Sequence, residues 1–414
     1  MPTYYLNSTS GDDVSDGLSE LRPWRSLDRL QRHIYQEGAS GDRYLLRAGN
    51  VFAGSLGCHL GGQVHFGSYD GSATAVIRSG SRDGIYHFGQ AQLSVDGITV
   101  EGDGRDIASG VNVCPQSEPC AGVTLRRVRA TGYARAGILL AGALSQGEVR
   151  DCHLHGNAVG LFTSGNQTPD GYGIRNLNIL DSVFDANNLP DPTGLSGVNG
   201  FGCNLAGVMD ASVLGCRFTR NGNVASEAGG HAGLIVQFCR RVRMLHCHSE
   251  GNSDPTADGD GQGFVIDDSE DVEVAYCTAE GDRTGFSAHG EANAPLRRVV
   301  FRNNLARNCM VGLNLLAGDG DVWFLDNQVE CAAVEGEYKV ALNIHDAGGP
   351  SYFFRNLFSV RGAAHLLMAA GPRGLANVHG LTANDWLAEN PSFVVRGIGH
   401  DSLTAALAAE PVGV

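Results

Sequence analysis

A short strand pattern recurs along most of the chain. In each copy a small residue is followed by an apolar residue, any residue, another apolar residue and any residue. The small residues of the copies are Gly137, Gly160, Gly202, Gly233, Gly263, Gly285, Gly312 and Ala341. They lie 22 to 42 residues apart, which indicates one coil of fixed circumference that carries loop insertions of different length.

A second apolar pattern precedes most copies of the first. Its segments are Val149–Cys152, Val213–Cys216, Met244–Cys247, Val274–Cys277, Phe301–Asn304 and Phe324–Asn327. Each coil therefore offers at least two short strands with period-two alternation, separated by turns rich in Gly and Asn. Helical periodicity is nearly absent from this part of the chain. The sequence thus predicts an all-β fold, a single-stranded right-handed parallel β-helix, whose coils stack about 4.8 Å apart.

The ends of such a solenoid need caps, because they would otherwise expose the core. Residues Ser26 to Gln36 predict a short N-terminal capping helix. Ser26 is suited to cap the helix N-terminus, and Leu27, Leu30 and Ile34 share one helical face.

The chain is accordingly divided into three parts. Residues 1–55 are expected to form the N-terminal cap and opening strands, and residues 56–375 the β-helix. Residues 376–414 contain Trp386 and an Ala-rich tail, and we expect them to cover the far end.

Several of the eleven cysteines are explained by the repeat. Four of them, Cys152, Cys216, Cys247 and Cys277, share one coil position with Ser182, Asn304 and Asn327. Stacked small or polar residues are common inside solenoid turns, so we expect reduced, buried thiols there. No CxxC metal spacing occurs. Cys114 and Cys120 are the pair best placed for a disulfide, because they flank one short loop.

Composition narrows the classes of partner. Acidic residues number 45 and basic residues 30, which gives a net charge of −15, and Lys339 is the only lysine. Such a surface repels phosphate backbones, so no nucleic-acid partner is expected. No apolar run approaches the roughly 18 residues of a membrane span, so no membrane partner is expected either. Residues 2–10 do not read as a signal peptide, and the sequence leaves compartment and oligomeric state undetermined.

The strand pattern also predicts which side chains point outward. The first and third residues after each small residue are apolar and should face the core, whereas the second and fourth should face solvent. On three consecutive coils the fourth position holds Gln237, Asp267 and His289, and Asp268 follows Asp267. Their backbones should lie about 5 to 10 Å apart. We therefore take Asp267, Asp268 and His289 as candidate catalytic residues and Gln237 as a candidate substrate-binding residue.

Further ionisable residues occur near the same strands. His231, Asp260 and Arg283 precede the strands of these coils, and His345 holds the fourth position two coils after His289. We take these residues as candidate substrate-binding residues, because polar groups concentrate on these coils. No metal ligands are predicted among them.

The opening of the chain resembles that of bacterial carbohydrate-active β-helix proteins of the pectate-lyase-like superfamily. The resemblance rests on the segments Tyr4–Asn7, Pro23–Leu27 and Gly41–Gly49. It implies the architecture but no particular substrate.

A second resemblance is to polygalacturonase-type glycoside hydrolases. That family carries an Asp-Asp motif at the end of an outward strand and a Gly-His-Gly-like motif one coil later. Here the matching segments are Ile266-Asp267-Asp268 and Ala288-His289-Gly290. The resemblance implies Asp267 as the general acid, Asp268 as part of the base that activates water, and His289 as the group that tunes the acid.

The chain departs from that family at two other motifs. The family's Asn-Thr-Asp motif is replaced by Gln237-Phe238, and no Arg-x-Lys motif follows His289. The third carboxylate and the uronate-binding pair are therefore missing. A substrate other than polygalacturonate is expected, in the class of polysaccharides and oligosaccharides.

Three other functions stay open at this point. A polysaccharide lyase or uronate epimerase would share the fold and would use His289 and Arg283, although the single lysine counts against it. A non-catalytic glycan-binding, phage-tail or surface solenoid would need no such groups, and an isomerase of small cyclic molecules is the remaining class. A glycoside hydrolase is the leading hypothesis.

No cofactor is required by this hypothesis, although lyases of this fold often use Ca²⁺. The acidic cluster Asp12, Asp13 and Asp16 has ligands suited to Ca²⁺. We expect these residues to form a structural turn instead.

Overall fold

The computed structural model describes residues 1–58, 62–90, 92–115, 119–165, 171–190, 200–222, 231–253, 261–290, 296–317, 320–370 and 375–408. These residues form two compact units. The first covers Met1–Ala211, and the second covers the described residues from Ser212 onward. Strand β20 (Val208–Leu214) contains the boundary.

In each unit the chain passes repeatedly through three parallel sheets, which we call A, B and C in chain order. In the first unit, sheet A contains β1 (Thr3–Leu6), β2 (Asp42–Arg47), β5 (Gln63–Tyr69), β8 (Gln92–Asp96), β11 (Val123–Arg126), β14 (Gly147–Arg150) and β17 (Ile174–Leu180). Sheet B contains β3 (Val51–Ala53), β6 (Ala75–Gly80), β9 (Ile98–Gly102), β12 (Arg129–Thr131), β15 (His153–His155) and β18 (Val183–Asp185). Sheet C contains β4 (Leu56–Cys58), β7 (Ile85–His87), β10 (Ser109–Val113), β13 (Ala136–Ala141), β16 (Val159–Ser164) and β19 (Phe201–Ala206).

The second unit repeats this order. Its sheet A contains β23 (Arg240–Leu245), β26 (Glu270–Ala275), β29 (Arg297–Arg302), β32 (Val322–Leu325), β35 (Ser351–Phe354) and β38 (Val378–His379). Its sheet B contains β21 (Arg217–Thr219), β24 (His248–Glu250), β27 (Thr278–Glu280), β30 (Leu305–Arg307), β33 (Gln328–Ala333), β36 (Leu357–Gly362) and β39 (Asp385–Ala388). Its sheet C contains β22 (Ala232–Gln237), β25 (Gln262–Asp267), β28 (Thr284–Gly290), β31 (Val311–Ala317), β34 (Val340–Ala347), β37 (His365–Ala369), β40 (Phe393–Val395) and β41 (Ile398–His400).

This arrangement is the predicted parallel β-helix. Each strand pairs with the strand three elements earlier and three elements later through most of both units. Every described strand pairing is parallel except that between β40 and β41. Helices are short and few among the described residues: α1 (Leu27–Gln36), the 3₁₀ turn η1 (Leu381–Ala383) and α2 (Leu403–Ala408). None of them is long and apolar enough to cross a membrane.

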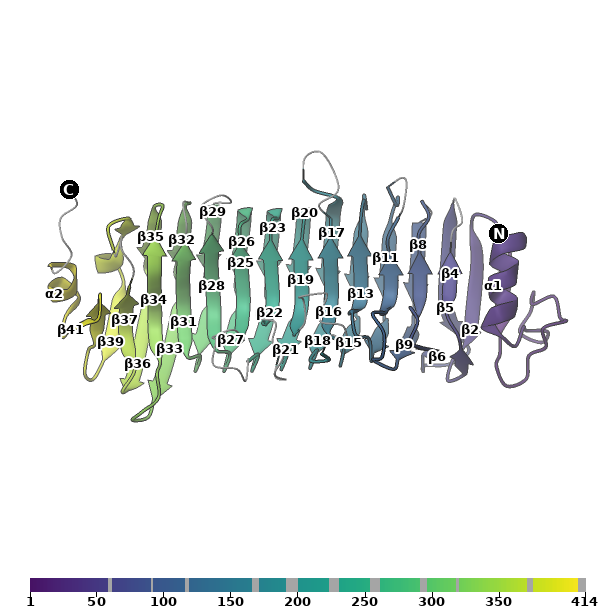
Figure 1. Ribbon diagram of the computed structural model, residues 1–414, viewed down its shortest axis with the longest axis horizontal. Coiled ribbons are helices and arrows are strands. Elements are labelled where there is room, and N and C mark those ends of the chain that lie inside the picture. The colour runs from purple at the N-terminus through teal and green to yellow at the C-terminus, as the bar shows by residue number, and fades with distance from the viewer. Residues whose placement is uncertain are drawn as a thin grey trace. The chain divides into compact units, whose positions relative to one another are not determined.

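The predicted capping helix is confirmed as α1. The Ser26 hydroxyl accepts a hydrogen bond from the Arg29 amide at 3.1 Å, and Leu27, Leu30 and Ile34 are buried. Figure 1 shows α1 beside the first strands of the chain, at the purple end of the first unit. Its apolar face therefore covers the N-terminal end of the core.

The acidic cluster near α1 forms the expected turn. Asp13 accepts hydrogen bonds from the amides of Arg25 and Ser26 and from the Ser26 hydroxyl. These bonds lower the pKa of the Asp13 carboxyl, although partial burial opposes the shift. Asp12 accepts from the Val14 amide. The carboxylates thus hold the chain that leads into the helix.

Polar ladders run through the turns between sheets A and B. In the second unit the Cys277 amide donates to Asn304 Oδ1 at 2.9 Å, and Asn304 donates in the same way to Asn327. The ladder continues through Asn356 to Asn384. Each side chain satisfies buried backbone groups of the neighbouring coil, which stabilises the stack.

The cysteines occupy the positions that the repeat predicted. In the first unit the Cys152 amide donates to the Ser182 hydroxyl at 3.1 Å, as Cys277 does to Asn304. All eleven cysteines are thiols, so no disulfide joins Cys114 to Cys120. Every cysteine but Cys114 is buried.

Buried thiols should resist labelling in the native protein. We expect a thiol reagent to modify Cys114 rapidly, and Cys216, Cys247 and Cys277 only after denaturant is added, because these three are at most 2% exposed. Burial also raises the pKa of Cys331 to about 12, which suppresses the reactive thiolate. Mass spectrometry of the labelled chain measures this. Rapid native labelling of Cys216, Cys247 or Cys277 would contradict the inward assignment.

Candidate functional site

The predicted polar row lies on sheet C of the second unit. Gln237 ends β22, Asp267 ends β25 and His289 lies near the end of β28. In the pairing of these strands Gln237 is opposite Asp267, and Asp267 is opposite His289. The strand pattern thus correctly placed the three residues side by side on consecutive coils.

Asp267 and His289 form a direct contact. Asp267 Oδ1 lies 3.6 Å from His289 Nδ1, and the two side chains are 21% and 45% exposed. The imidazole is therefore open to solvent, whereas the carboxylate is largely shielded. A protonated imidazole at this distance forms an ion pair with the carboxylate.

Backbone hydrogen bonds fix the strand end that carries Asp267. Its carbonyl oxygen accepts from the Ser269 hydroxyl at 2.7 Å and from the Phe238 amide at 3.3 Å. The Asp268 amide donates to the His289 carbonyl at 3.1 Å. Asp268 itself has a φ of 43°, so the chain turns sharply between the two aspartates.

One exposed aromatic side chain beside this row was not singled out by the sequence pattern. Phe238 follows Gln237 in the turn after β22, as Asp268 follows Asp267 after β25. Its side chain is 53% exposed and its φ is 52°. A bulky residue with positive φ is unusual. The sequence does contain a signal for this residue, because Phe238 is an aromatic residue directly after the fourth position of a copy.

The second position of several copies differs from the prediction. It was expected to face solvent, yet Val265, Ser287 and Asn314 are at most 7% exposed. Asn314 donates to the Ser287 hydroxyl at 3.1 Å, and Asn343 donates to Asn314 at 2.8 Å. These side chains form a covered polar row next to the exposed one. Strand alternation gives the direction of a side chain but does not tell whether neighbouring chain covers it.

The remaining candidates lie away from the Asp267–His289 pair. His231 is 1% exposed and precedes β22, and Arg283 precedes β28. His345 lies at an irregularity of β34, where Leu316 pairs with Asp346 instead. Asp260 lies outside the described residues. The structure therefore does not bring His231, Arg283 and His345 together with the pair.

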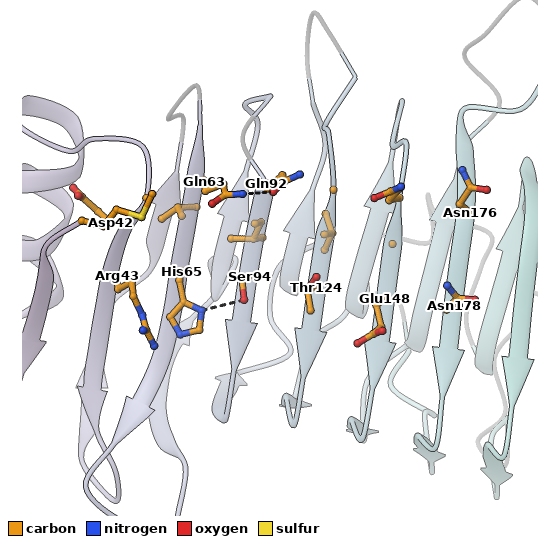
Figure 2. Close-up of a pocket in the computed structure, with 18 residues that line it drawn as sticks. Asp42, Arg43, Gln63, His65, Gln92, Ser94, Thr124, Glu148, Asn176 and Asn178 are labelled. Atoms are coloured by element: carbon orange, nitrogen blue, oxygen red, sulfur yellow. Dashed lines mark hydrogen bonds between the residues drawn. The ribbon is translucent and has the colours of Figure 1, made fainter.

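A groove on sheet A of the first unit was not predicted. It has a volume of about 720 Å³. Its floor carries polar side chains from successive strands, and Figure 2 shows Arg43, His65, Ser94 and Thr124 following one another along it. Individually these residues look like ordinary outward positions. Only the register of strands that lie more than twenty residues apart shows that they form rows.

Among the residues that the structure describes, no group of three or more His, Cys, Asp or Glu side chains is arranged to hold a metal ion. Asp12 and Asp13 are engaged in the turn before α1, as described above. The Asp267–His289 pair itself offers a carboxyl group and an imidazole.

Comparisons with known proteins support the fold. A family profile described as a right-handed β-helix region matches residues 182–329. No curated protein matches the sequence.

Several solved structures share the architecture. The A-module of mannuronan C-5 epimerase AlgE4 from Azotobacter vinelandii is 13% identical, with a TM-score of 0.51 over 87% of this chain and 97% of that one. The GH136 lacto-N-biosidase from Eubacterium ramulus is 14% identical, with a TM-score of 0.49 over 95% and 68%. Pectate lyase Pel9A is 15% identical, with a TM-score of 0.47 over 99% and 85%. The chain thus has the right-handed parallel β-helix fold, and its resemblance to carbohydrate-active β-helix proteins is confirmed at the level of the fold.

Proposed function

We propose that the chain is a glycan-active enzyme that cleaves glycosidic bonds by acid–base hydrolysis at Asp267, Asp268 and His289. The observation that carries the proposal is the contact of 3.6 Å between Asp267 Oδ1 and His289 Nδ1 on adjacent coils. Carboxyl and imidazole groups are the commonest proton donors and acceptors in catalysis. Catalytic contacts of this length tighten when a substrate is bound.

Each residue has a distinct role in this proposal. Asp267 protonates the leaving oxygen, Asp268 belongs to the base that activates water, and His289 controls the proton on Asp267 through their contact. Inverting hydrolases need two carboxyl groups about 6.5–9.5 Å apart, with a water between substrate and base. Asp267 has strand conformation, whereas Asp268 has positive φ. The two side chains therefore leave the backbone in different directions, which makes room for that water.

The sugar is held beside these groups. Gln237 lies opposite Asp267 in the pairing and can hydrogen-bond a hydroxyl group of the substrate. The exposed ring of Phe238 offers a flat apolar surface one coil away from Asp268. His345, two coils after His289, contacts a neighbouring sugar unit.

Strand geometry favours hydrolysis over a lyase or epimerase that uses Arg283 and His289 together. Six residues separate the two along an extended strand, which places their Cα atoms about 20 Å apart. A lyase must neutralise a uronate carboxylate next to the proton that the base removes. Arg283 and His289 are too far apart to act on one sugar unit.

A glycan panel tests the proposal. The full chain is incubated with neutral and uronate-containing polysaccharides, and reducing ends and ultraviolet absorbance are measured in parallel. We expect new reducing ends without new absorbance, because hydrolysis creates no C=C bond. Since the proposed acid and base are side chains, activity should survive EDTA. New absorbance would show a lyase, and absence of both signals on every glycan would favour a non-catalytic solenoid.

A further inference from the structure

The geometry points to a second carbohydrate-binding site: we infer that the groove on sheet A of the first unit binds an extended, uncharged glycan chain that lies across the strands. The groove is independent of the proposed catalytic residues, since all its lining residues precede residue 180. Binding there requires no turnover.

The groove floor is built from two in-register rows of polar side chains. The first row consists of Arg43, His65, Ser94, Thr124, Glu148 and Asn178, which are successive partners in the strand pairing. The second row lies two residues earlier on each strand and contains Gln63, Gln92, Gln146 and Asn176. Within a row the strand spacing is about 4.8 Å, and the rows are about 7 Å apart. A polymer that lies across the strands therefore meets a polar side chain of the first row at every strand (Figure 2).

Several of these groups have hydrogen-bonding capacity that the protein does not use. Gln63 donates to Gln92 Oε1 at 2.6 Å. This contact does not use the side-chain nitrogen of Gln92. Within the described part of the chain, the side chains of Thr124, Gln146 and Asn178 have no hydrogen-bond partner, and the two amides are exposed. Amides donate and accept at once, as sugar hydroxyl groups do. The row is thus matched to a polyhydroxylated ligand.

Charge along the groove is nearly balanced. Glu148 pairs with Arg126 at 2.8 Å and contacts Arg150 at 3.7 Å. Burial and the nearby Arg43 lower the pKa of His65, although Asp96 opposes the shift, so a positive charge on its ring is disfavoured. Among the side chains that line the groove, Arg43 at the first strand is the one permanent cation, and Asp42 is a second carboxyl group beside Glu148. A polyanion with one charge per repeat would lack cations over most of the groove, which favours an uncharged chain.

The same features argue against a protein or nucleic acid. Protein interfaces place aromatic and other apolar anchors at their centre, whereas the exposed side chains of this floor are amides, hydroxyls and single charges. Nucleic acids need a series of Lys or Arg side chains for their phosphates. An uncharged glycan is the polymer whose groups match both rows.

A glycine provides a way to close the groove without disturbing the fold. Gly122 interrupts the second row between Gln92 and Gln146. A Cβ atom at Gly122 would lie 3.8 Å from the nearest atoms, which is ordinary van der Waals contact. Gly122→Gln should therefore fold and fill the hollow. Gly399→Gln is the matched control, because nothing lies within 4 Å of a Cβ there and Gly399 belongs to the second unit.

The test is affinity electrophoresis of the full chain in gels that contain soluble arabinoxylan, galactan or hydroxyethyl cellulose, with polygalacturonate and alginate as acidic probes. At least one neutral polysaccharide should retard the protein, with little effect of added salt. Gly122→Gln should weaken that retardation at least about tenfold and Gln92→Ala up to about tenfold, whereas Gly399→Gln should leave it unchanged.

Three results would overturn the inference. No neutral polysaccharide retards the protein, retardation persists fully in Gly122→Gln, or only acidic polysaccharides retard it and salt abolishes the effect. Retardation that survives in Gly122→Gln belongs to another surface, such as the Asp267–His289 pair. Loss of activity in the panel above, with groove binding intact, would refute the proposed hydrolysis alone.

Discussion

Replacing Asp282 by Asn should stabilise the protein at pH 8 and change its stability little at pH 4. Asp282 is 1% exposed and follows β27. Its Oδ1 accepts two hydrogen bonds from Asn252, at 2.8 Å from the backbone amide and 2.9 Å from the side chain. Burial raises the pKa of the Asp282 carboxyl to about 7, although these hydrogen bonds lower it. The folded protein therefore prefers the protonated form.

The sign of the pH dependence follows from this shift. In the unfolded chain the carboxyl ionises near its ordinary pKa of about 3.9. The folded state is thus favoured below that pH, and this advantage is lost as the pH rises from about 4 to about 7. Above pH 7 the buried charge costs up to about 4 kcal/mol, from a shift of about three pKa units. An amide at position 282 keeps both bonds from Asn252 and carries no charge.

Urea unfolding of the full chain at pH 4 and pH 8 measures the effect. The difference in unfolding free energy between Asp282→Asn and the unsubstituted protein should grow with pH and level off above about pH 7. The control is Asp326→Asn, because hydrogen bonds from Arg355 lower the pKa of that exposed carboxyl. It should stabilise at neither pH. Equal stability of Asp282→Asn and the unsubstituted protein at pH 8 would refute a buried, charged carboxyl.

The surroundings of Asp282 also explain why the strand pattern could be predicted from the sequence. A methyl group at Gly263 would lie 2.8 Å from the Gly285 carbonyl oxygen and 2.7 Å from Asp282 Oδ2. Neighbouring coils approach each other closely at this point, so the chain needs a small residue once per coil. That need makes the repeat visible and fixes the register of sheet C. The row of Gln237, Asp267 and His289 followed from it.

Other parts of the candidate sites depend on information that one coil does not contain. Nothing in the sequence around Asp282 marks it as buried, but the polar ladder that begins at Asn221 takes it into the interior. The groove floor depends on the register of sheet A. Its row residues, such as His65 and Ser94, differ in type, so no sequence repeat marks them. Ser287 is buried and accepts a hydrogen bond from Asn314 on the next coil, a contact that its own coil does not announce. Periodicity therefore predicted the direction of side chains and the register of strands. The burial of individual side chains and the position of the groove became visible only in the folded structure.

The largest effect on function is expected at the Asp267–His289 pair. On a glycan that the protein is shown to cleave, Asp267→Asn should lower kcat at least about 100-fold, the contribution typical of general acid–base catalysis. An amide fits the same partly exposed space, so folding should persist. His289→Ala should lower kcat as well. If the two act as a unit, the double variant should lose little more than Asp267→Asn alone.

Substitutions around the pair separate catalysis from binding and from folding. Asp268→Asn should lower kcat if that carboxylate activates water, whereas Gln237→Ala should mainly raise KM because it removes a contact to the sugar. Asp326→Asn, on an exposed turn of the same unit, should leave both constants unchanged. Near-full activity of Asp267→Asn, Asp268→Asn and His289→Ala would show that these three residues take no part in catalysis. Catalysis would then have to reside elsewhere, and His231 and Arg283 at the opposite end of the same strands would be the next residues to change.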